Sequence, residues 1–181
     1  MQLRFVLELH FKGEQSMDIE FRKVSSFGKG TLFDLLADAY SFDQRCSEYW
    51  DCAWQEFDDF FFNNLHIADE CGFITILNNK AIGFVSWDPR NMPNYVEIGH
   101  NCIASKHKGN GYGRLQLREA MKRISSNDVK KIIVTTNGIL KPAQRMYKGA
   151  GFKLIRTRKN ESDTKFTGEY MDYEYHLNQQ E

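Results

Sequence analysis

The residues best placed to do chemistry form a glycine-rich segment, Lys108-Gly109-Asn110-Gly111-Tyr112-Gly113-Arg114. The segment lies between a predicted strand and a predicted helix. Glycines let successive backbone N–H groups converge on one anion, and the N-terminus of the following helix adds partial positive charge. The segment therefore predicts a binding site for a pyrophosphate group.

Three anion-binding patterns compete for this segment. A Walker P-loop needs Gly-Lys followed by Ser or Thr, whereas Arg114 follows Gly113. A Rossmann fingerprint needs G-x-G-x-x-G, and its last glycine would fall on Arg114 or Gln116. The remaining pattern, a polar or basic residue followed by x-x-G-x-G, fits Lys108, Gly111 and Gly113. A plain glycine-rich turn is the alternative.

This pattern resembles the acetyl-CoA signature of the GNAT superfamily of N-acetyltransferases, which is Arg or Gln followed by x-x-G-x-G or A. The resemblance covers roughly residues 18–177. One strand ends at Ser105 just before the loop, another ends at Asn137, and the run 142–152 resembles the family's closing segment, in which a helix carrying a tyrosine is followed by Gly-Phe. Lys108 departs from the family's Arg or Gln, which should weaken geometric specificity more than charge.

The resemblance implies acetyl-CoA as the co-substrate and no metal. It implies that the backbone of the glycine loop holds the pyrophosphate and that the end of the preceding strand pairs with the pantetheine arm. Asn137 would bond the arm or the substrate, and a turn residue in Asn137-Gly138 is the alternative. The predicted cofactor-binding residues are Cys102, Ile103, Lys108, Gly109, Asn110, Gly111, Tyr112, Gly113, Arg114 and Asn137.

An acceptor amine needs a base, because an amine with a pKa near 10 is mostly protonated at pH 7. Glu97 is the candidate, eleven residues before Lys108, which is the spacing of the catalytic glutamate in histone-type GNAT enzymes. Burial would have to raise its pKa, or a water would have to relay the proton. A strand glutamate on a solvated face is the alternative. His100 is a second candidate, on the opposite face of a regular strand unless a bulge redirects it.

Tyr147 resembles the family's general acid. Its phenol stays protonated at pH 7 and could give its proton to the leaving thiolate. A tyrosine packed in the core is the alternative. Direct transfer in a ternary complex is expected, because no His-Cys arrangement supports Cys102 as a nucleophile.

The elements that must position these residues follow from hydrophobic periodicity. Strands are predicted at 18–24, 73–77, 81–87, 95–104, 131–135, 152–157 and 171–177, and helices at 31–40, 46–61, 115–124 and 142–149. The order β-α-α-β-β-β-α-β-α-β-β predicts an α/β (α+β) fold, with a mixed, mainly antiparallel central sheet flanked by helices on both faces.

One domain is expected over residues 17–181, because the chain has no repeat, low-complexity run or linker. Residues 1–16 form an N-terminal extension outside the resemblance, and Met17 is an alternative start. If the extension is translated, Leu3–Phe11 adds an edge strand or pairs two chains into a homodimer.

Charge is balanced over the whole chain but segregated along it. The 24 Lys and Arg match 24 Asp and Glu, which argues against nucleic acid as a partner. Residues 17–70 hold 12 acids and 4 bases, whereas residues 106–159 hold 15 bases and 2 acids. The basic half suits the phosphates of CoA. The acidic, aromatic half around Asp58, Asp59 and Phe60 suits a cationic amine, unless its acids are merely solvated and its aromatics form the core.

The expected location is cytoplasmic, with no membrane partner. No apolar run reaches the roughly 18 residues that cross a bilayer, and the start of the chain makes a poor signal peptide. The four cysteines predict reduced, mostly buried thiols. Two functions stay open. One is an N-acetyltransferase acting on a small-molecule amine or a protein amino group, favoured by the presence of both Glu97 and Tyr147. The other is a non-catalytic acyl-CoA-binding sensor or interaction module.

Overall fold

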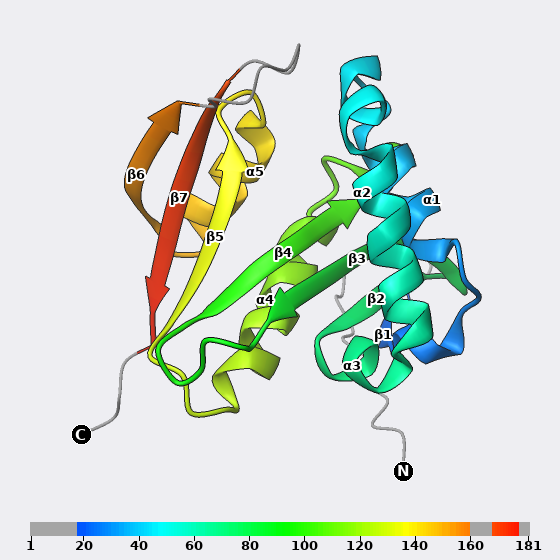
Figure 1. Ribbon diagram of the computed structural model, residues 1–181, viewed down its shortest axis with the longest axis horizontal. Helices are drawn as coiled ribbons and strands as arrows, with labels where there is room; N and C mark the ends of the chain where they lie inside the picture. Colours follow the sequence, from blue (N-terminus) through cyan, green and yellow to red (C-terminus); the bar gives the residue numbers. More distant parts are fainter. Residues whose placement is uncertain (1–17, 160–167, 178–181) are drawn as a thin grey trace, which may run out of the picture.

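The computed structural model describes residues 18–159 and 168–177 (Figure 1). The extension 1–16 and the expected edge strand at Leu3–Phe11 lie outside the described residues. The elements are β1 (Ile19–Arg22), η1 (Val24–Ser26), α1 (Thr31–Tyr40), α2 (Gln44–Asn63), α3 (Leu65–Glu70), β2 (Gly72–Leu77), β3 (Lys80–Asp88), β4 (Val96–Ile103), η2 (Ser105–His107), α4 (Tyr112–Ser125), β5 (Lys131–Asn137), α5 (Lys141–Gly149), β6 (Lys153–Lys159) and β7 (Glu169–His176).

The strands form one sheet in the order β1-β2-β3-β4-β5-β7-β6. Neighbouring strands are antiparallel except β4 and β5, which are parallel. The predicted mixed, mainly antiparallel sheet is therefore confirmed. The observed order adds to the predicted one only the short helix α3 and two 3-10 turns.

The parallel pair β4 and β5 separates soon after it forms. Its register covers only Val96–Ile98 against Ile132–Val134. Beyond Ile98, β4 stays paired with β3 as far as Ile103, while β5 stays paired with β7 as far as Asn137. Figure 1 shows the two strands diverging toward their C-terminal ends. The sheet thus opens between two of its own strands.

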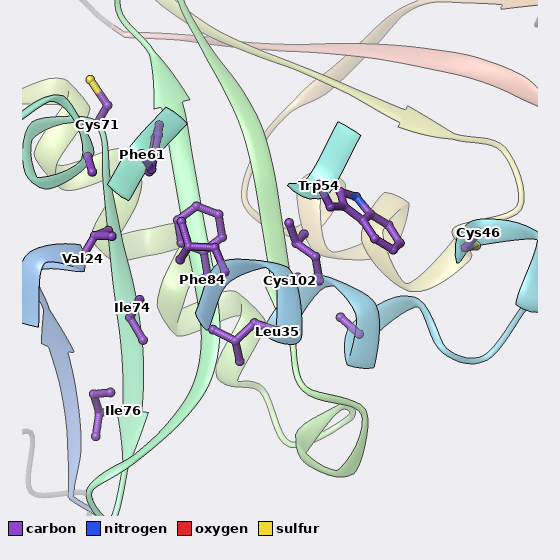
Figure 2. Packing of buried hydrophobic residues seen from close by; sticks show 14 residues of the cluster. Val24, Leu35, Cys46, Trp54, Phe61, Cys71, Ile74, Ile76, Phe84 and Cys102 are labelled. Carbon is purple, nitrogen blue, oxygen red and sulfur yellow. The ribbon is translucent and has the colours of Figure 1, made fainter. Parts of the chain in front are cut away.

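Two hydrophobic clusters hold the helices on the two faces of the sheet. The first lies under α1, α2 and α3, where Ile74, Phe84 and Cys102 of the strands pack with Leu35 and Trp54 of the helices (Figure 2). The second lies on the opposite face, where α4 and α5 cover the sheet with residues that include Leu117 and Tyr147. Side chains alternate between the faces along each strand, so both clusters draw on the same strands.

The carboxylate of Asp58 in α2 caps the start of α1. It is fully buried and accepts hydrogen bonds from the backbone N–H groups of Gly30 at 2.7 Å, Leu32 at 3.0 Å and Phe33 at 3.3 Å. The first N–H groups of a helix have no partner within the helix and carry partial positive charge, which a carboxylate satisfies. Its neighbour Asp59 pairs with Lys29 at 2.9 Å. The expected acidic wall for an amine is therefore wrong for Asp58, which faces the end of a helix instead.

All four cysteines are free, and Cys46, Cys71 and Cys102 are buried while Cys52 is exposed. This confirms the expected mostly buried thiols. Among the described residues, no helix has the length and apolar character needed to span a membrane.

Candidate active site

The glycine loop takes a conformation that only glycine adopts easily. Gly109 and Gly111 have φ values of 82° and 84°, in the left-handed region. A Cβ atom at either position would meet nothing within 4 Å, so this side of the loop is open. The backbone N–H groups of Gly109, Asn110 and Gly111 have no hydrogen-bond partner among the described residues. They adjoin the first turn of the 14-residue helix α4, where Arg114 is exposed.

The third glycine of the loop, Gly113, is needed for close packing and not for its backbone conformation. A Cβ atom at Gly113 would lie 3.2 Å from the Met146 sulfur and 3.5 Å from Cγ1 of Ile103. Gly113 therefore lets α4 approach α5 and β4 closely. Tyr112 begins α4 and is buried, with its ring 6.1 Å from that of His107. The loop as a whole presents backbone donors at a helix N-terminus, which is an arrangement that binds anions.

Lys108 is directed away from this anion site. Its ammonium group donates to the backbone oxygen of Ala39 at the end of α1 and lies 5.1 Å from the ring centre of Phe42. Burial lowers its pKa. In the same region, the backbone N–H of Ser105 donates to Asp38 at 2.6 Å. Lys108 thus attaches α1 to the glycine loop, and its predicted contact with a pyrophosphate stays a prediction.

A pocket of about 140 Å³ lies where β4 and β5 separate. Gly99 and Asn101 of β4 form one side, Thr135 and Asn137 of β5 form the other, and Tyr147 of α5 closes it. Three aromatic side chains also line the pocket: Tyr40 of α1, Trp50 of α2 and Tyr170 of β7. Among the described residues, no charged side chain lines this pocket.

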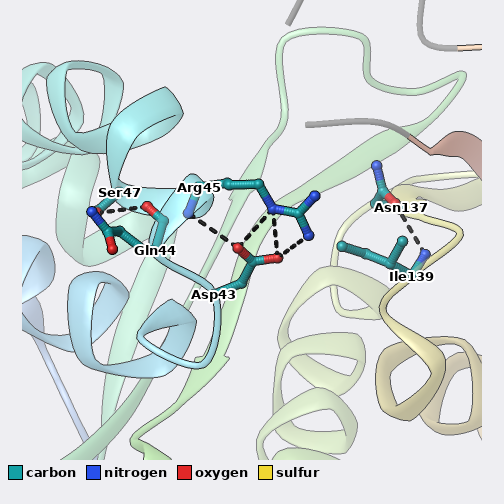
Figure 3. A network of polar contacts seen from close by, with 6 residues as sticks. All are labelled: Asp43, Gln44, Arg45, Ser47, Asn137 and Ile139. Atoms are coloured by element: carbon teal, nitrogen blue, oxygen red, sulfur yellow. Dashed lines mark hydrogen bonds and ion pairs between the residues drawn. The ribbon is translucent and has the colours of Figure 1, made fainter. Parts of the chain in front are cut away.

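Two buried amide donors in this pocket lack a partner. The Nδ2 atoms of Asn101 and Asn137 have no hydrogen bond among the described residues. The Oδ1 atom of Asn137 accepts from the backbone N–H of Ile139 at 3.0 Å (Figure 3), so Asn137 does make the turn named as its alternative role. An unpaired buried donor costs about 1–3 kcal/mol. Because Nδ2 of Asn137 is free, the pocket suits a ligand that carries a carbonyl oxygen, as a pantetheine arm does.

The last residues of β4 present an open strand edge to the same space. Cys102 and Ile103 pair with Phe84 and Gly83 of β3, and the register of β5 does not reach them. The thiol of Cys102 belongs to the cluster under α1 and α2, and burial raises its pKa to about 12. A thiol with so high a pKa is a poor nucleophile, so covalent chemistry at Cys102 is not expected.

Tyr147 is both packed and placed at the pocket. Its ring lies 5.6 Å from that of Phe152 and 6.2 Å from that of Tyr173. Burial raises the pKa of Tyr147 to about 12, and the side chain of Asn101 opposes that rise. The phenol is therefore protonated at neutral pH, as a general acid must be.

A bulge in β4 places Glu97 and His100 on the same face of the sheet. Ile98 lies opposite Trp87 while His100 lies opposite Ser86, so Gly99 is the extra residue. His100 packs 4.2 Å from the ring of Phe57 in α2. Burial lowers the pKa of His100 to about 4, so its imidazole is neutral at pH 7.

Glu97 is half-buried at the point where β4 and β5 begin to separate. Burial raises its pKa, Asp88 and Asp172 raise it further, and Arg158 opposes the rise. A raised pKa makes its carboxylate a better base than an ordinary one. The side chain does not line the pocket itself, although Gly99, two residues further on, does. A water would therefore have to relay a proton between them.

Three polar residues at the pocket and behind it, Asn101, Gln116 and Thr75, were not predicted as functional from the sequence. Gln116 of α4 is fully buried and contacts both Asn101 and Thr75. Two features of the sequence indicate Thr75 and Gln116 as unusual positions. Thr75 interrupts the apolar strand Phe73–Leu77, and Gln116 stands between two leucines on a helix that packs against the sheet.

Residues 31–152 match the sequence profile of the Acetyltransferase (GNAT) family. The chain therefore belongs to the GNAT family of acetyltransferases. Among solved structures, a GNAT family acetyltransferase from Elizabethkingia anophelis with acetyl-CoA bound is 16% identical, with a TM-score of 0.64 over 91% of this chain and 100% of that one. The NatC complex bound to Gag peptide and CoA matches with a TM-score of 0.65 at 17% identity, over 88% of this chain and 99% of that one. At these identities the likeness shows the fold.

The N-acetylaspartate synthetase of Xenopus tropicalis is 24% identical over 85 residues, which cover 47% of this chain. The match spans only 31% of that relative, so this chain corresponds to about a third of its length.

Proposed function

We propose that this protein transfers an acetyl group from acetyl-CoA to a primary amine, by direct attack in a ternary complex. The observation that carries the proposal is the pocket between β4 and β5, where a protonated phenol and two unpartnered amide donors meet. The free backbone N–H groups of the glycine loop at the start of α4 support it.

Each part of acetyl-CoA has residues that fit it. The pyrophosphate fits the backbone of residues 109–114, and the pantetheine arm fits the open edge of Cys102 and Ile103 together with Nδ2 of Asn137. When bound, acetyl-CoA supplies a thioester whose carbonyl carbon the amine attacks. Tyr147 holds the proton that the sulfur needs, and Glu97 receives the amine's proton through water.

The acceptor proposed is a small-molecule amine or a protein amino group. Tyr40, Trp50 and Tyr170 give the pocket aromatic walls without charge, which favours an amine attached to an apolar or aromatic group. The N-acetylaspartate synthetase match suggests aspartate as a probe, and the peptide in the NatC complex suggests peptides with a free N-terminus. We also propose a cytoplasmic location, which the four free cysteines support.

A thiol-release assay with acetyl-CoA tests the function. The panel contains aromatic amines, amino acids including aspartate, and short peptides with free N-termini. We expect release of CoA above the background rate with at least one class. Stoichiometric binding of acetyl-CoA with no turnover for any class would refute the enzyme and favour the non-catalytic sensor.

The role of Glu97 is tested by the pH dependence of kcat/KM. Below the pKa of the amine, log kcat/KM falls by one unit per pH unit, because only the neutral amine attacks. At pH values below the raised pKa of Glu97, a second proton binds to Glu97 and inhibits the reaction. The slope of log kcat/KM against pH therefore becomes two in the wild type and stays at one in Glu97→Gln. Glu119→Gln, which removes a carboxylate paired with Arg123 on α4, is the control and should keep the wild-type profile. Identical profiles for the wild type and Glu97→Gln would remove Glu97 from the mechanism.

A further inference from the structure

A buried polar network reaches from α4 through the sheet to the pocket. Gln116 is fully buried, and the two N–H groups of its Nε2 face three acceptors, so that one N–H is shared: the backbone oxygen of Phe84 at 2.9 Å, the backbone oxygen of Cys102 at 3.1 Å and Oδ1 of Asn101 at 2.7 Å. Its Oε1 atom accepts from the Thr75 hydroxyl at 2.6 Å. Every polar atom of the Gln116 side chain is therefore used.

This network fixes the orientation of two amides. Backbone carbonyl oxygens only accept hydrogen bonds, so the NH₂ group of Gln116 must be the one that faces Phe84 and Cys102. The atom of Asn101 that lies 2.7 Å from this NH₂ group must then be the acceptor, Oδ1. It follows that Nδ2 of Asn101 points away from Gln116. That atom is buried and has no hydrogen-bond partner among the described residues.

The site of Gln116 is shaped for it. A Cβ atom at Gly83 would lie 2.7 Å from Oε1 of Gln116 and 2.7 Å from the backbone oxygen of Cys102. No side chain fits at Gly83 while Gln116 holds this position. Thr75 on β2, Gly83 on β3 and Asn101 on β4 thus form a matched set around one helix residue.

The free donor of Asn101 and the Tyr147 phenol belong to side chains that line the same pocket. Both residues line the pocket, and the Asn101 side chain is the one group that lowers the pKa of Tyr147 against the effect of burial. A donor that approaches the phenolic oxygen stabilises the phenolate.

We propose that Asn101 is a positioning residue for Tyr147: its Nδ2, unpartnered beside the neutral phenol, donates to the phenolic oxygen when Tyr147 loses its proton, and Gln116, held by Thr75, keeps the carboxamide turned that way. The inference rests on the proposed function. As the C–N bond forms and the C–S bond breaks, Tyr147 gives this proton to the sulfur. Asn101 holds the phenolate until it regains, through solvent, the proton that the amine released.

A titration that needs no turnover tests the contact directly. A fluorinated tyrosine at position 147 is titrated by ¹⁹F NMR in the otherwise wild-type chain and in variants. We expect Asn101→Leu to raise the pKa of the phenol by about one unit, because a donor to the charged form is lost. Gln116→Leu should raise it as well, since Asn101 is then free to turn. Asn91→Leu, in an exposed loop, is the control. A phenol pKa unchanged by Asn101→Leu overturns the inference.

A double-mutant cycle tests the consequence for catalysis. Asn101→Leu should lower kcat about 10-fold or more and leave KM for acetyl-CoA unchanged. In the Tyr147→Phe background, Asn101→Leu should lower kcat by less than about 2-fold, because the two residues act as one unit. Losses that multiply, or a raised KM for acetyl-CoA, would show that Asn101 binds the co-substrate instead and overturn the inference.

Asn101→Asp keeps the acceptor for Gln116 and covers the case in which the leucine variant does not fold. An ionised carboxylate cannot donate, but a protonated one can. The ratio of its kcat to that of the wild type should therefore rise as the pH falls, and a flat ratio contradicts the positioning role. If the wild type itself releases no CoA with any amine, the proposed function fails, and the ¹⁹F titration still decides whether Asn101 holds the phenol.

Discussion

Replacing Asp58 by alanine should destabilise the protein by removing the cap of α1. The change leaves three backbone N–H groups, those of Gly30, Leu32 and Phe33, without their acceptor. Leu32 is fully buried and the other two are partly buried, so water replaces the carboxylate only in part. An unsatisfied buried donor costs about 1–3 kcal/mol, which gives a loss of about 3 kcal/mol for the set. For a domain of this size, Tm should fall by about 6–12 °C.

The isosteric variant Asp58→Asn refines this expectation. Its oxygen can still accept from Leu32 and Phe33, but its NH₂ group would face the N–H of Gly30 that now bonds to Oδ2. Two donors would then oppose each other, so we expect an intermediate loss of about 2 kcal/mol.

Urea unfolding followed by tryptophan fluorescence measures these losses, because Trp54 is buried in the hydrophobic cluster under α1. The matched control is the adjacent Asp59→Ala. Its ion pair with Lys29 is solvent-exposed and should contribute little. Equal losses for Asp58→Ala and Asp59→Ala, or no loss for either, would refute the capping role of Asp58.

Two further predictions concern the glycine loop. Gly111→Ala should raise the dissociation constant of acetyl-CoA about 10-fold, because a φ of 84° costs an L-residue about 1–2 kcal/mol. Calorimetry measures the dissociation constant, with Gly28→Ala as the control. An unchanged constant for Gly111→Ala would show that the loop does not bind the coenzyme. Lys108→Met keeps the apolar stem of the side chain but loses the hydrogen bond to the backbone oxygen of Ala39 at the end of α1. KM for the amine should therefore rise more than the dissociation constant of acetyl-CoA, and steady-state kinetics separate these two effects. A larger rise in the dissociation constant of acetyl-CoA would assign Lys108 to the pyrophosphate.

Much of the fold could be predicted because its elements carry strong periodic patterns. Helix α1 has the predicted bounds, and the aromatic stripe of α2 lies within Gln44–Asn63. Helix α3 was missed because its six residues follow α2 with only Asn64 between them. The separation of β4 from β5 leaves no periodic signal, since it depends on which strand pairs with which.

The candidate site was less predictable where one residue changes direction. The bulge at Gly99 puts His100 on the same face as Glu97, which simple alternation excludes. Asp58 and Asp59 are identical neighbours in sequence, yet only Asp58 is turned toward the end of α1. Such choices depend on tertiary contacts. The positions of Asn101 and Gln116 depend on them too, because a lone buried amide is satisfied only by groups from other elements.

Thiol release by wild type and Tyr147→Phe tests the central claim, that acetyl transfer takes place in the pocket between β4 and β5. The change removes one hydroxyl from a buried ring and leaves its packing in place. We predict that kcat falls about 100-fold or more while the dissociation constant of acetyl-CoA stays the same. An active wild type whose kcat survives the change in full would contradict the account.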